Sequence, residues 1–259
     1  MHCEQKKYQL DLVVVSNERL TERHVLLRLT HSCPLPEMLP GQFVEVRIDD
    51  TPDVMLRRPI SIHHVDGANN ELWLLVATVG KGTQWMGTLS KGDTVNAILP
   101  LGNGFDMDNS GQRPLLVGGG VGVAPLYDLG FRLKSHGVEP TFLLGARVQA
   151  DLLQLSLFQQ LGQTLVTTED GSMGERGFVT QHSVLQAEHF THIYTCGPKP
   201  MMVSVARYAQ ERQIPCEASL ENMMACGLGA CLCCVEKTTE GNLCVCKDGP
   251  VFNTNLLLW

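Results

Sequence analysis

The feature that most constrains this chain is a dense group of cysteines: six of its ten cysteines lie between Cys226 and Cys246. In an exported protein such a density would predict disulfides. The start of the sequence, Met1–Lys7, has no apolar stretch of the signal-peptide kind, so we expect a cytoplasmic protein. Clustered cysteines in a reducing compartment favour metal ligation over disulfide pairing. A bound metal centre would also stabilise a short segment that is too small to build much core of its own.

The spacing of three of these cysteines narrows the kind of centre. Cys226, Cys231 and Cys234 follow the pattern C-x4-C-x2-C, which opens the ligand set of plant-type two-iron clusters. Structural zinc sites show paired C-x2-C knuckles instead, so the spacing favours a [2Fe–2S] cluster over zinc. The interleaved Gly227 and Gly229 permit backbone angles that other residues resist, and they let amide groups approach the cluster sulfurs.

The fourth ligand is left open by the spacing. Cys244 and Cys246 flank Val245, and an extended segment would place both cysteines on one face. Periodicity therefore does not choose between them. Cys233 is adjacent to Cys234, and the x2 spacing selects Cys234.

The pattern along the chain predicts three regions: residues 1–111, 112–215 and 216–259. The first is rich in short strand signals separated by turns, which is typical of an antiparallel barrel. The second alternates strands with helices, which predicts a parallel sheet of the nucleotide-binding kind. The third is the cysteine-rich module. The clearest expected elements are strands at Leu10–Ser16, His24–Thr30, Gln42–Ile48, Ile60–His64, Leu72–Val79, Pro114–Val117, Thr141–Leu144, Thr164–Thr168 and His192–Thr195, and a helix at Lys199–Gln210.

Composition excludes several classes of function. The formal net charge is −7, which argues against broad nucleic-acid binding because that requires a basic surface. No apolar run is long enough to span a bilayer, so we expect no membrane insertion.

Two segments of the first region suit a bound flavin. Arg58-Pro59-Ile60-Ser61 matches the Arg-x-Tyr-Ser/Thr motif of flavin reductases in the ferredoxin–NAD(P) reductase superfamily, except that Ile60 replaces the aromatic residue. An arginine fork suits a pyrophosphate, and a serine hydroxyl can bind the edge of a flavin ring. The segment Gly80–Thr83 follows an expected strand, where glycine-rich backbone can approach a phosphate closely. A plain hairpin turn at Gly80–Thr83 is the alternative.

Two segments of the second region suit a dinucleotide. Gly118–Pro125 contains Gly120 and Gly122 and lies between an expected strand and an expected helix, which is the context of a dinucleotide-binding loop. It resembles the G-G-x-G-x-A-P variant of the same superfamily. Cys196-Gly-Pro follows another expected strand, and in the superfamily this tripeptide lies where nicotinamide meets flavin. A tight turn with a buried thiol is the alternative for Cys196.

Taken together, these motifs resemble the electron-transfer subunits of NAD-dependent (B-type) dihydroorotate dehydrogenases over nearly the whole chain. The residues that carry the resemblance are Arg58-Pro-Ile-Ser61, Gly102-Asn-Gly-Phe105, Gly118–Pro125, Cys196-Gly-Pro198, Ser219-Leu-Glu221, Met224-Ala-Cys226-Gly-Leu-Gly-Ala-Cys231 and Cys246-Lys-Asp-Gly-Pro-Val-Phe252.

The resemblance implies specific site residues. It selects Cys246 as the fourth cluster ligand, because the family's last ligand precedes a Lys/Glu-Asp-Gly-Pro-Val-Phe motif. Cys233 and Cys244 then become extra thiols. The flavin contacts that it implies are Arg58, Pro59, Ile60, Ser61, Leu75, Val76, Ala77, Gly82 and Thr83.

The resemblance also implies a role in pyrimidine biosynthesis. Electrons from dihydroorotate would pass from FMN in a catalytic partner, through the [2Fe–2S] cluster and FAD, to NAD+, in a heterotetramer with two copies of each subunit. No catalytic acid or base is expected, because hydride transfer from flavin needs none. One alternative is a reductase subunit of another redox complex. Another, from a different class, is a non-enzymatic metal-binding redox sensor.

Overall fold

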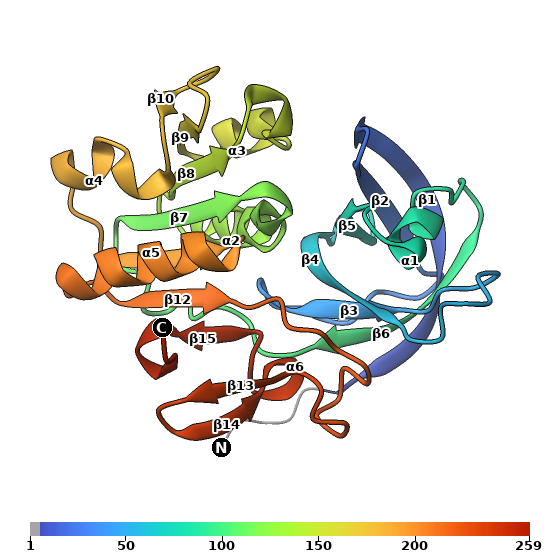
Figure 1. Ribbon diagram of the computed structural model, residues 1–259. Helices are drawn as coiled ribbons and strands as arrows, with labels where there is room; N and C mark the ends of the chain where they lie inside the picture. Colours follow the sequence, from blue (N-terminus) through green and yellow to red (C-terminus); the bar gives the residue numbers. More distant parts are fainter. Residues whose placement is uncertain (1–5) are drawn as a thin grey trace. The chain divides into compact units, whose positions relative to one another are not determined.

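A computed structural model describes residues 6–259 of the chain, which divides into two compact units (Figure 1). The first unit gathers the chain up to Gly104 together with Glu221–Glu236 and Leu243–Pro250. The second comprises Phe105–Leu220, Lys237–Asn242 and Val251–Trp259. Each unit is described by itself.

The first unit is built on a closed antiparallel barrel with the strand order β1-β2-β5-β4-β3-β6. Its interior is filled by aliphatic side chains at alternate strand positions, such as Val44 and Val46 of β3, while the intervening residues point outward. One short helix, α1 (Lys81–Met86), follows β5. The strands are β1 (Tyr8–Thr21), β2 (His24–Thr30), β3 (Phe43–Val46), β4 (Arg58–Asp66), β5 (Glu71–Ala77) and β6 (Thr94–Leu101).

The second unit is built on a seven-stranded sheet with the order β10-β9-β8-β7-β11-β12-β15. All neighbouring strands are parallel except β15, which runs antiparallel to β12. The strands are β7 (Pro114–Gly119), β8 (Thr141–Ala146), β9 (Gln163–Thr168), β10 (Glu175–Arg176), β11 (His192–Cys196), β12 (Cys216–Ser219) and β15 (Val251–Asn253).

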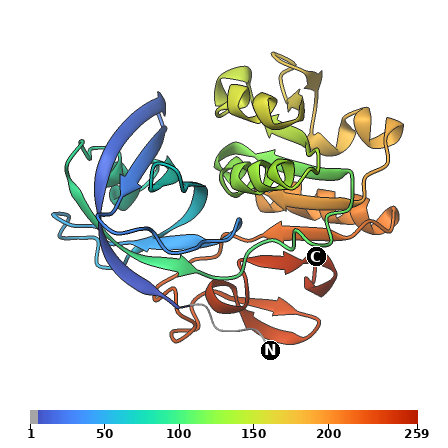
Figure 2. The same ribbon diagram turned by 180° about the vertical axis from the view of Figure 1, so that it is seen from behind.

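Helices cover both faces of this sheet, as a parallel sheet requires. Helix α5 (Lys199–Glu211) crosses one face in Figure 1, and α2 (Ala124–Ser135) lies in front of the other face in Figure 2. On the α2 side, the ring of Phe158 packs in T-shaped pairs with the rings of Tyr127 and Phe142. The two shorter helices are α3 (Leu155–Leu161) and α4 (Val184–Ala187).

The C-terminal segment contributes to both units. Strands β12 and β15 extend the parallel sheet, whereas Glu221–Glu236 and Leu243–Pro250 belong to the barrel unit. Between them lies a hairpin of β13 (Val235–Thr238) and β14 (Gly241–Cys244), followed by α6 (Val245–Asp248). The boundaries of the two compact units therefore differ from those of the three predicted regions. Residues 216–259 are shared between the units, because some of them pair with the parallel sheet and others pack against the barrel.

The predicted fold class is confirmed: an antiparallel barrel, a parallel-sheet domain and a C-terminal cysteine module. The clearest local difference is at Gly80–Thr83. Gly80 caps α1 and residues 81–86 are helical, so neither an irregular glycine-rich loop nor a hairpin turn describes this segment. The Thr83 hydroxyl accepts a hydrogen bond from the Gly80 amide (3.1 Å) at the start of this helix.

Candidate functional site

The cysteine loop of the barrel unit is shaped by two glycines in the left-handed region. Gly227 has φ of +67° and Gly229 has φ of +79°, as the sequence predicts. The turn directs backbone amides at sulfur: Gly229 N donates to Cys246 Sγ (3.1 Å) and Leu228 N donates to Cys226 Sγ (3.4 Å). Amides aimed at thiolates offset their negative charge, which is what a cluster of four thiolates requires.

The four predicted ligands fall into two pairs. Cys226 accepts a further hydrogen bond from Cys231 N (3.5 Å), and Cys246 N donates to Cys234 Sγ (3.4 Å). A two-iron cluster needs two pairs of thiolates, one for each iron, so this arrangement fits it. Within residues 6–259, no three His, Cys, Asp or Glu side chains are gathered in the manner of a site for a single metal ion.

The thiols of the two pairs differ in electrostatics. Burial acts to raise the pKa of Cys226, but amide hydrogen bonds from Leu228 and Cys231 outweigh it and bring that pKa down to about 6. Burial, with the neighbouring Cys234 thiol, raises the pKa of Cys246 to about 12. The loop amides thus favour the thiolate form of Cys226, whereas burial favours the protonated form of Cys246.

The geometry around Cys244 and Cys246 differs from the extended segment considered above. Cys244 ends β14, and Val245–Asp248 turns into α6, so the two cysteines do not lie at alternate positions of one strand. Cys246 contacts the cysteine loop, while the Cys244 amide donates to Asp248 Oδ2 (2.6 Å). The helix therefore supports Cys246 as the ligand.

Two of the segments that carry the family resemblance meet beside this loop. Asn103 N donates to Gly249 O (2.6 Å), and its side-chain amide donates to Lys247 O (3.2 Å) and Asp248 O (2.9 Å). A Cβ on Gly102 would lie 2.4 Å from Pro250 Cδ, so only glycine allows this close approach. The segment carrying Cys246 is thereby fixed to the end of β6.

The predicted flavin contacts lie on two facing strand edges of the barrel. The ladder between β4 and β5 begins at Ile62 and Leu74. Beyond this end of the ladder, Arg58–Ser61 of β4 pair with β3. At the same end, Leu75–Ala77 of β5 pair with β2. The strands therefore separate between the two predicted segments, and each presents a backbone edge that the β4–β5 ladder does not use, which fits a ligand that hydrogen-bonds to backbone.

Helix α1 brings a further predicted contact next to this opening. A Cβ on Gly82 would lie 3.0 Å from Arg58 Nε and 3.2 Å from Ile48 Cγ1. The Arg58 guanidinium is held by hydrogen bonds from Nη1 to Leu56 O (2.8 Å) and Arg57 O (3.1 Å). Gly82 and Arg58 thus form one surface, and an anchored guanidinium fits a pyrophosphate. Ile60 packs partly against the barrel core.

The predicted dinucleotide loop and the Cys-Gly-Pro turn lie against each other in the second unit. A Cβ on Gly122 would lie 2.5 Å from Gly197 Cα and 2.7 Å from the carbonyl carbon of Cys196. Gly120 has φ of +56° and open space beside it. Both segments follow the carboxyl ends of adjacent parallel strands, β7 and β11, where open α/β sheets bind their ligands. Cys196 itself is 0% exposed, which supports a structural thiol rather than a reacting one.

Two buried polar features of the structure could not be recognised from the sequence. Glu45 of β3 is a fully buried carboxyl group next to the cysteine loop, and burial raises its pKa to about 7 against the opposing effect of Arg57. Its sequence context, Phe-Val-Glu-Val, is that of an ordinary strand with one outward charge. Nothing in such a pattern indicates that another segment covers the outward face.

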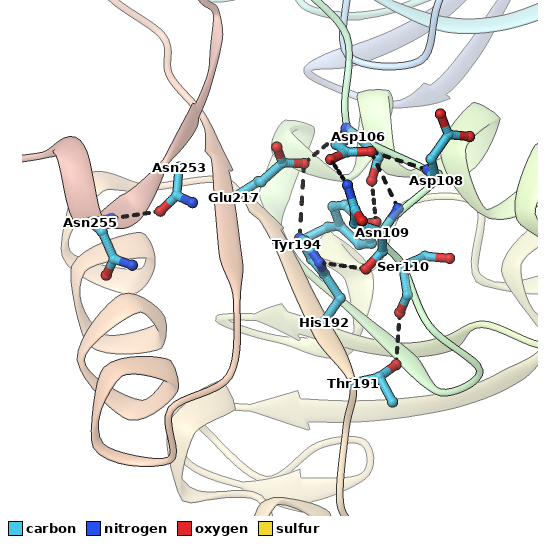
Figure 3. A network of polar contacts seen from close by, with 10 residues as sticks. All are labelled: Asp106, Asp108, Asn109, Ser110, Thr191, His192, Tyr194, Glu217, Asn253 and Asn255. Atoms are coloured by element: carbon cyan, nitrogen blue, oxygen red, sulfur yellow. Dashed lines mark hydrogen bonds and ion pairs between the residues drawn. The ribbon is translucent and has the colours of Figure 1, made fainter.

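The second feature is a polar network on one face of the parallel sheet (Figure 3). Tyr194 donates to Asp106 O (2.6 Å), and His192 Nδ1 donates to Asn109 O (3.1 Å). Glu217 accepts from Asp106 N (3.0 Å), and burial raises its pKa to about 7. The network binds the segment after Phe105 onto the sheet and holds the start of the second unit in place.

Comparison with known proteins places these features in a family. A model described as the iron-sulfur cluster binding domain of dihydroorotate dehydrogenase B matches residues 221–258, and an oxidoreductase NAD-binding domain model matches residues 116–207. The chain is 40% identical over 245 residues to the "Dihydroorotate dehydrogenase B (NAD(+)), electron transfer subunit" of Lysinibacillus sphaericus, covering 92% of this chain and 94% of that relative. The chain belongs to this family of electron transfer subunits.

Further relatives of the dihydroorotate dehydrogenase B electron transfer subunit family agree. The Fusobacterium nucleatum member is 41% identical over 221 residues, covering 82% of this chain and 84% of that relative. Among solved structures, one described as an NADH-dependent reduced ferredoxin-NADP oxidoreductase in flavin-based electron bifurcation has a TM-score of 0.87 and 29% identity, and covers 96% of this chain and 90% of that one. A ferredoxin reductase of carbazole 1,9a-dioxygenase shares the fold, with a TM-score of 0.69 and 19% identity over 82% of this chain and 68% of that one.

Family membership confirms the predicted cofactors, FAD and a [2Fe–2S] cluster with NAD as substrate, and the predicted function as an oxidoreductase electron-transfer subunit. Among the helices of residues 6–259, none combines the length and the hydrophobicity that a bilayer crossing needs.

Proposed function

We propose that this chain is the electron-transfer subunit of a cytoplasmic dihydroorotate dehydrogenase in pyrimidine biosynthesis, working with an FMN-containing catalytic subunit as a heterotetramer of two copies each. NAD+ accepts two electrons as a hydride, whereas an iron–sulfur cluster passes them singly, and FAD supplies the chemistry that links the two. The observation that carries the proposal is the cysteine loop, which is fixed to the same barrel that bears the predicted flavin contacts.

The chain's own residues have separate tasks in this function. Cys226 and Cys231 would hold one iron, and Cys234 and Cys246 the other. The amides of Leu228 and Gly229 offset thiolate charge, and the carbonyl contacts of Asn103 keep the Cys246 segment in register with the barrel.

The residues proposed to bind FAD lie on the barrel, and those proposed to bind NAD follow strands of the parallel sheet. Arg58 would bind pyrophosphate, and the backbone and hydroxyl of Ser61 would bind the ring edge. Gly122 keeps the dinucleotide loop close to the Cys-Gly-Pro turn, because any side chain there would collide with the turn's backbone. None of these residues needs to move a proton.

The surface around the cysteine loop supports a docking role for the catalytic partner. Met223 is 81% exposed and Leu232 is 63% exposed, and Leu228 is exposed between them in sequence. Cys231, one predicted ligand, is itself exposed. Exposed apolar side chains on the segment that carries a redox site favour the binding of another protein there, and short gaps favour electron transfer between the two subunits.

Co-purification with the native catalytic subunit tests the proposal. We expect stoichiometric FAD, iron and sulfide on this chain, FMN on its partner, and dihydroorotate:NAD+ activity that requires both chains. A complex that holds these cofactors but does not oxidise dihydroorotate would favour a reductase subunit of another redox complex. Zinc in place of iron, with no flavin absorption, would overturn both in favour of a metal-binding sensor.

A further inference from the structure

Glu45 is the most unusual buried side chain of the barrel unit. It is 0% exposed, and neither carboxylate oxygen has a hydrogen-bond partner among the residues that the structure describes. A buried carboxyl group without such bonds is costly, because it loses its hydration, and for Glu45 the attraction of Arg57 does not outweigh that loss. A neutral residue of similar size would be cheaper at this position, so a structural role alone does not account for a carboxyl group.

The burial of Glu45 comes from the cysteine loop. Its neighbours Val44 and Val46 point into the barrel core, which leaves Glu45 on the outer face of β3. There it lies under Gly227: a Cβ on that glycine would be 2.6 Å from Glu45 Cγ and 2.9 Å from Oε1. Gly227 directly follows the predicted ligand Cys226, so the carboxyl group is placed against the loop that holds the cluster.

Glu45 also faces the flavin segment. Its Cα pairs with that of Pro59 across the β3–β4 ladder, so the two side chains share the outer face of the barrel. The nearby Arg57 does not hydrogen-bond to the Glu45 carboxyl group. Its guanidinium donates to the backbone carbonyls of Glu45 and Asn96 (3.2 Å each) and to Asn96 Oδ1 (2.6 Å).

We propose that Glu45 is a positioning residue for electron transfer, whose buried carboxylate lies between the flavin strand and the cysteine loop and lowers the reduction potential of the [2Fe–2S] cluster. The inference rests on the proposed function, because it requires the cluster at Cys226, Cys231, Cys234 and Cys246.

The physical argument concerns charge. Adding an electron to the cluster increases its negative charge, and a carboxylate held beside the loop opposes that step. Cluster potentials respond to net charge and solvent exposure. Solvent is excluded from Glu45 and no described residue hydrogen-bonds to its oxygens, while the guanidinium groups of Arg57 and Arg58 offset its charge only in part, so the carboxylate still acts on the loop. A lower cluster potential favours onward transfer of the electron to FAD over its retention on the cluster.

The test is the midpoint potential of the cluster, measured by EPR during an anaerobic redox titration of the purified chain at pH 8, where the Glu45 carboxyl group is charged. Glu45→Gln keeps the shape of the side chain and removes its charge. We expect it to increase the ratio of reduced to oxidised cluster about tenfold at a fixed potential, a positive shift of about 59 mV for a one-electron couple. Glu45→Asp keeps a charge and should stay closer to wild type than Glu45→Gln.

The matched control is Glu18→Gln, which removes the same charge from an exposed position on β1 of the same barrel. It should leave the potential unchanged. A wild-type potential in Glu45→Gln, with normal iron and FAD content, would overturn the role of Glu45, and so would an equal shift in Glu18→Gln. A wild-type chain that binds no iron would instead overturn the proposed function, so the two failures are distinguishable.

Discussion

Replacing Gly82 by alanine tests how the barrel prepares its arginine for a pyrophosphate. The new Cβ would lie 3.0 Å from Arg58 Nε, 3.2 Å from Arg58 Cγ and 3.2 Å from Ile48 Cγ1. Arg58 cannot yield freely, because its guanidinium is tied to the carbonyls of Leu56 and Arg57. We therefore expect the substitution to move the guanidinium and to cost at least one of its hydrogen bonds.

The expected loss of FAD affinity follows from the contact that a displaced guanidinium would lose. A neutral hydrogen bond contributes about 1 kcal/mol, and one to a charged group contributes about 1.5–3 kcal/mol. Losing one such contact to FAD weakens binding by roughly ten- to a hundredfold, since about 1.4 kcal/mol corresponds to a factor of ten. The helix itself should not suffer, because alanine is the better helix former by about 1 kcal/mol.

Flavin fluorescence quenching on titration of apoprotein with FAD measures this loss directly. The control is Gly67→Ala, at a turn of the same barrel where a Cβ would meet nothing within 4 Å. It should bind FAD as wild type does. Unchanged FAD affinity in Gly82→Ala, or an equal loss in Gly67→Ala, would refute the reasoning that Gly82 positions Arg58.

Three further predictions follow from single positions. Gly122→Ala places a Cβ 2.5 Å from the Cα of Gly197, so it should raise the KM for NADH at least tenfold in steady-state assays while FAD content stays normal; an unchanged KM would contradict this. Gly227→Ala, at φ of +67° above a buried carboxyl group, should lower iron content but not FAD content on chemical analysis. Burial raises the pKa of Glu217 from 4.5 to about 7, so between these values the folded chain keeps a proton that the unfolded chain releases. The contribution of Glu217 to the free energy of unfolding is therefore fully present below about pH 4.5 and is lost as the pH rises through 7. The Tm of wild type relative to Glu217→Gln should therefore fall across that range, and a constant difference would contradict the assignment.

The part of the site that sequence could predict is the part that local spacing determines. Cys226, Cys231 and Cys234 lie in one loop, so their separations along the chain constrain their separations in space. The left-handed φ angles of Gly227 and Gly229 are predictable for the same reason. The strand pattern likewise predicts the barrel, and the alternation of short apolar strands with helices predicts the parallel sheet, because both patterns are local signals.

What sequence could not predict depends on contacts between distant segments. Cys246 becomes adjacent to the loop because α6 interrupts the expected extended segment, and four residues are too few for a helical period to be recognised. Glu45 looks like a solvent-facing strand residue until a segment some 180 positions later covers it. Strands β12 and β15 join the nucleotide-binding sheet from within the cysteine-rich region, and pairing partners of that kind leave no mark in periodicity.

The most direct test of the central claim is anaerobic reduction of the iron-reconstituted chain by NADH, followed by absorption and EPR spectroscopy. The account predicts bleaching of FAD and the EPR signal of a reduced [2Fe–2S] cluster in wild type and in Cys244→Ser. It predicts that Cys246→Ser keeps the flavin bleaching and loses the cluster signal. A cluster that survives in Cys246→Ser but is lost in Cys244→Ser would contradict the ligand set. Flavin that NADH does not reduce in wild type would contradict electron transfer through this chain.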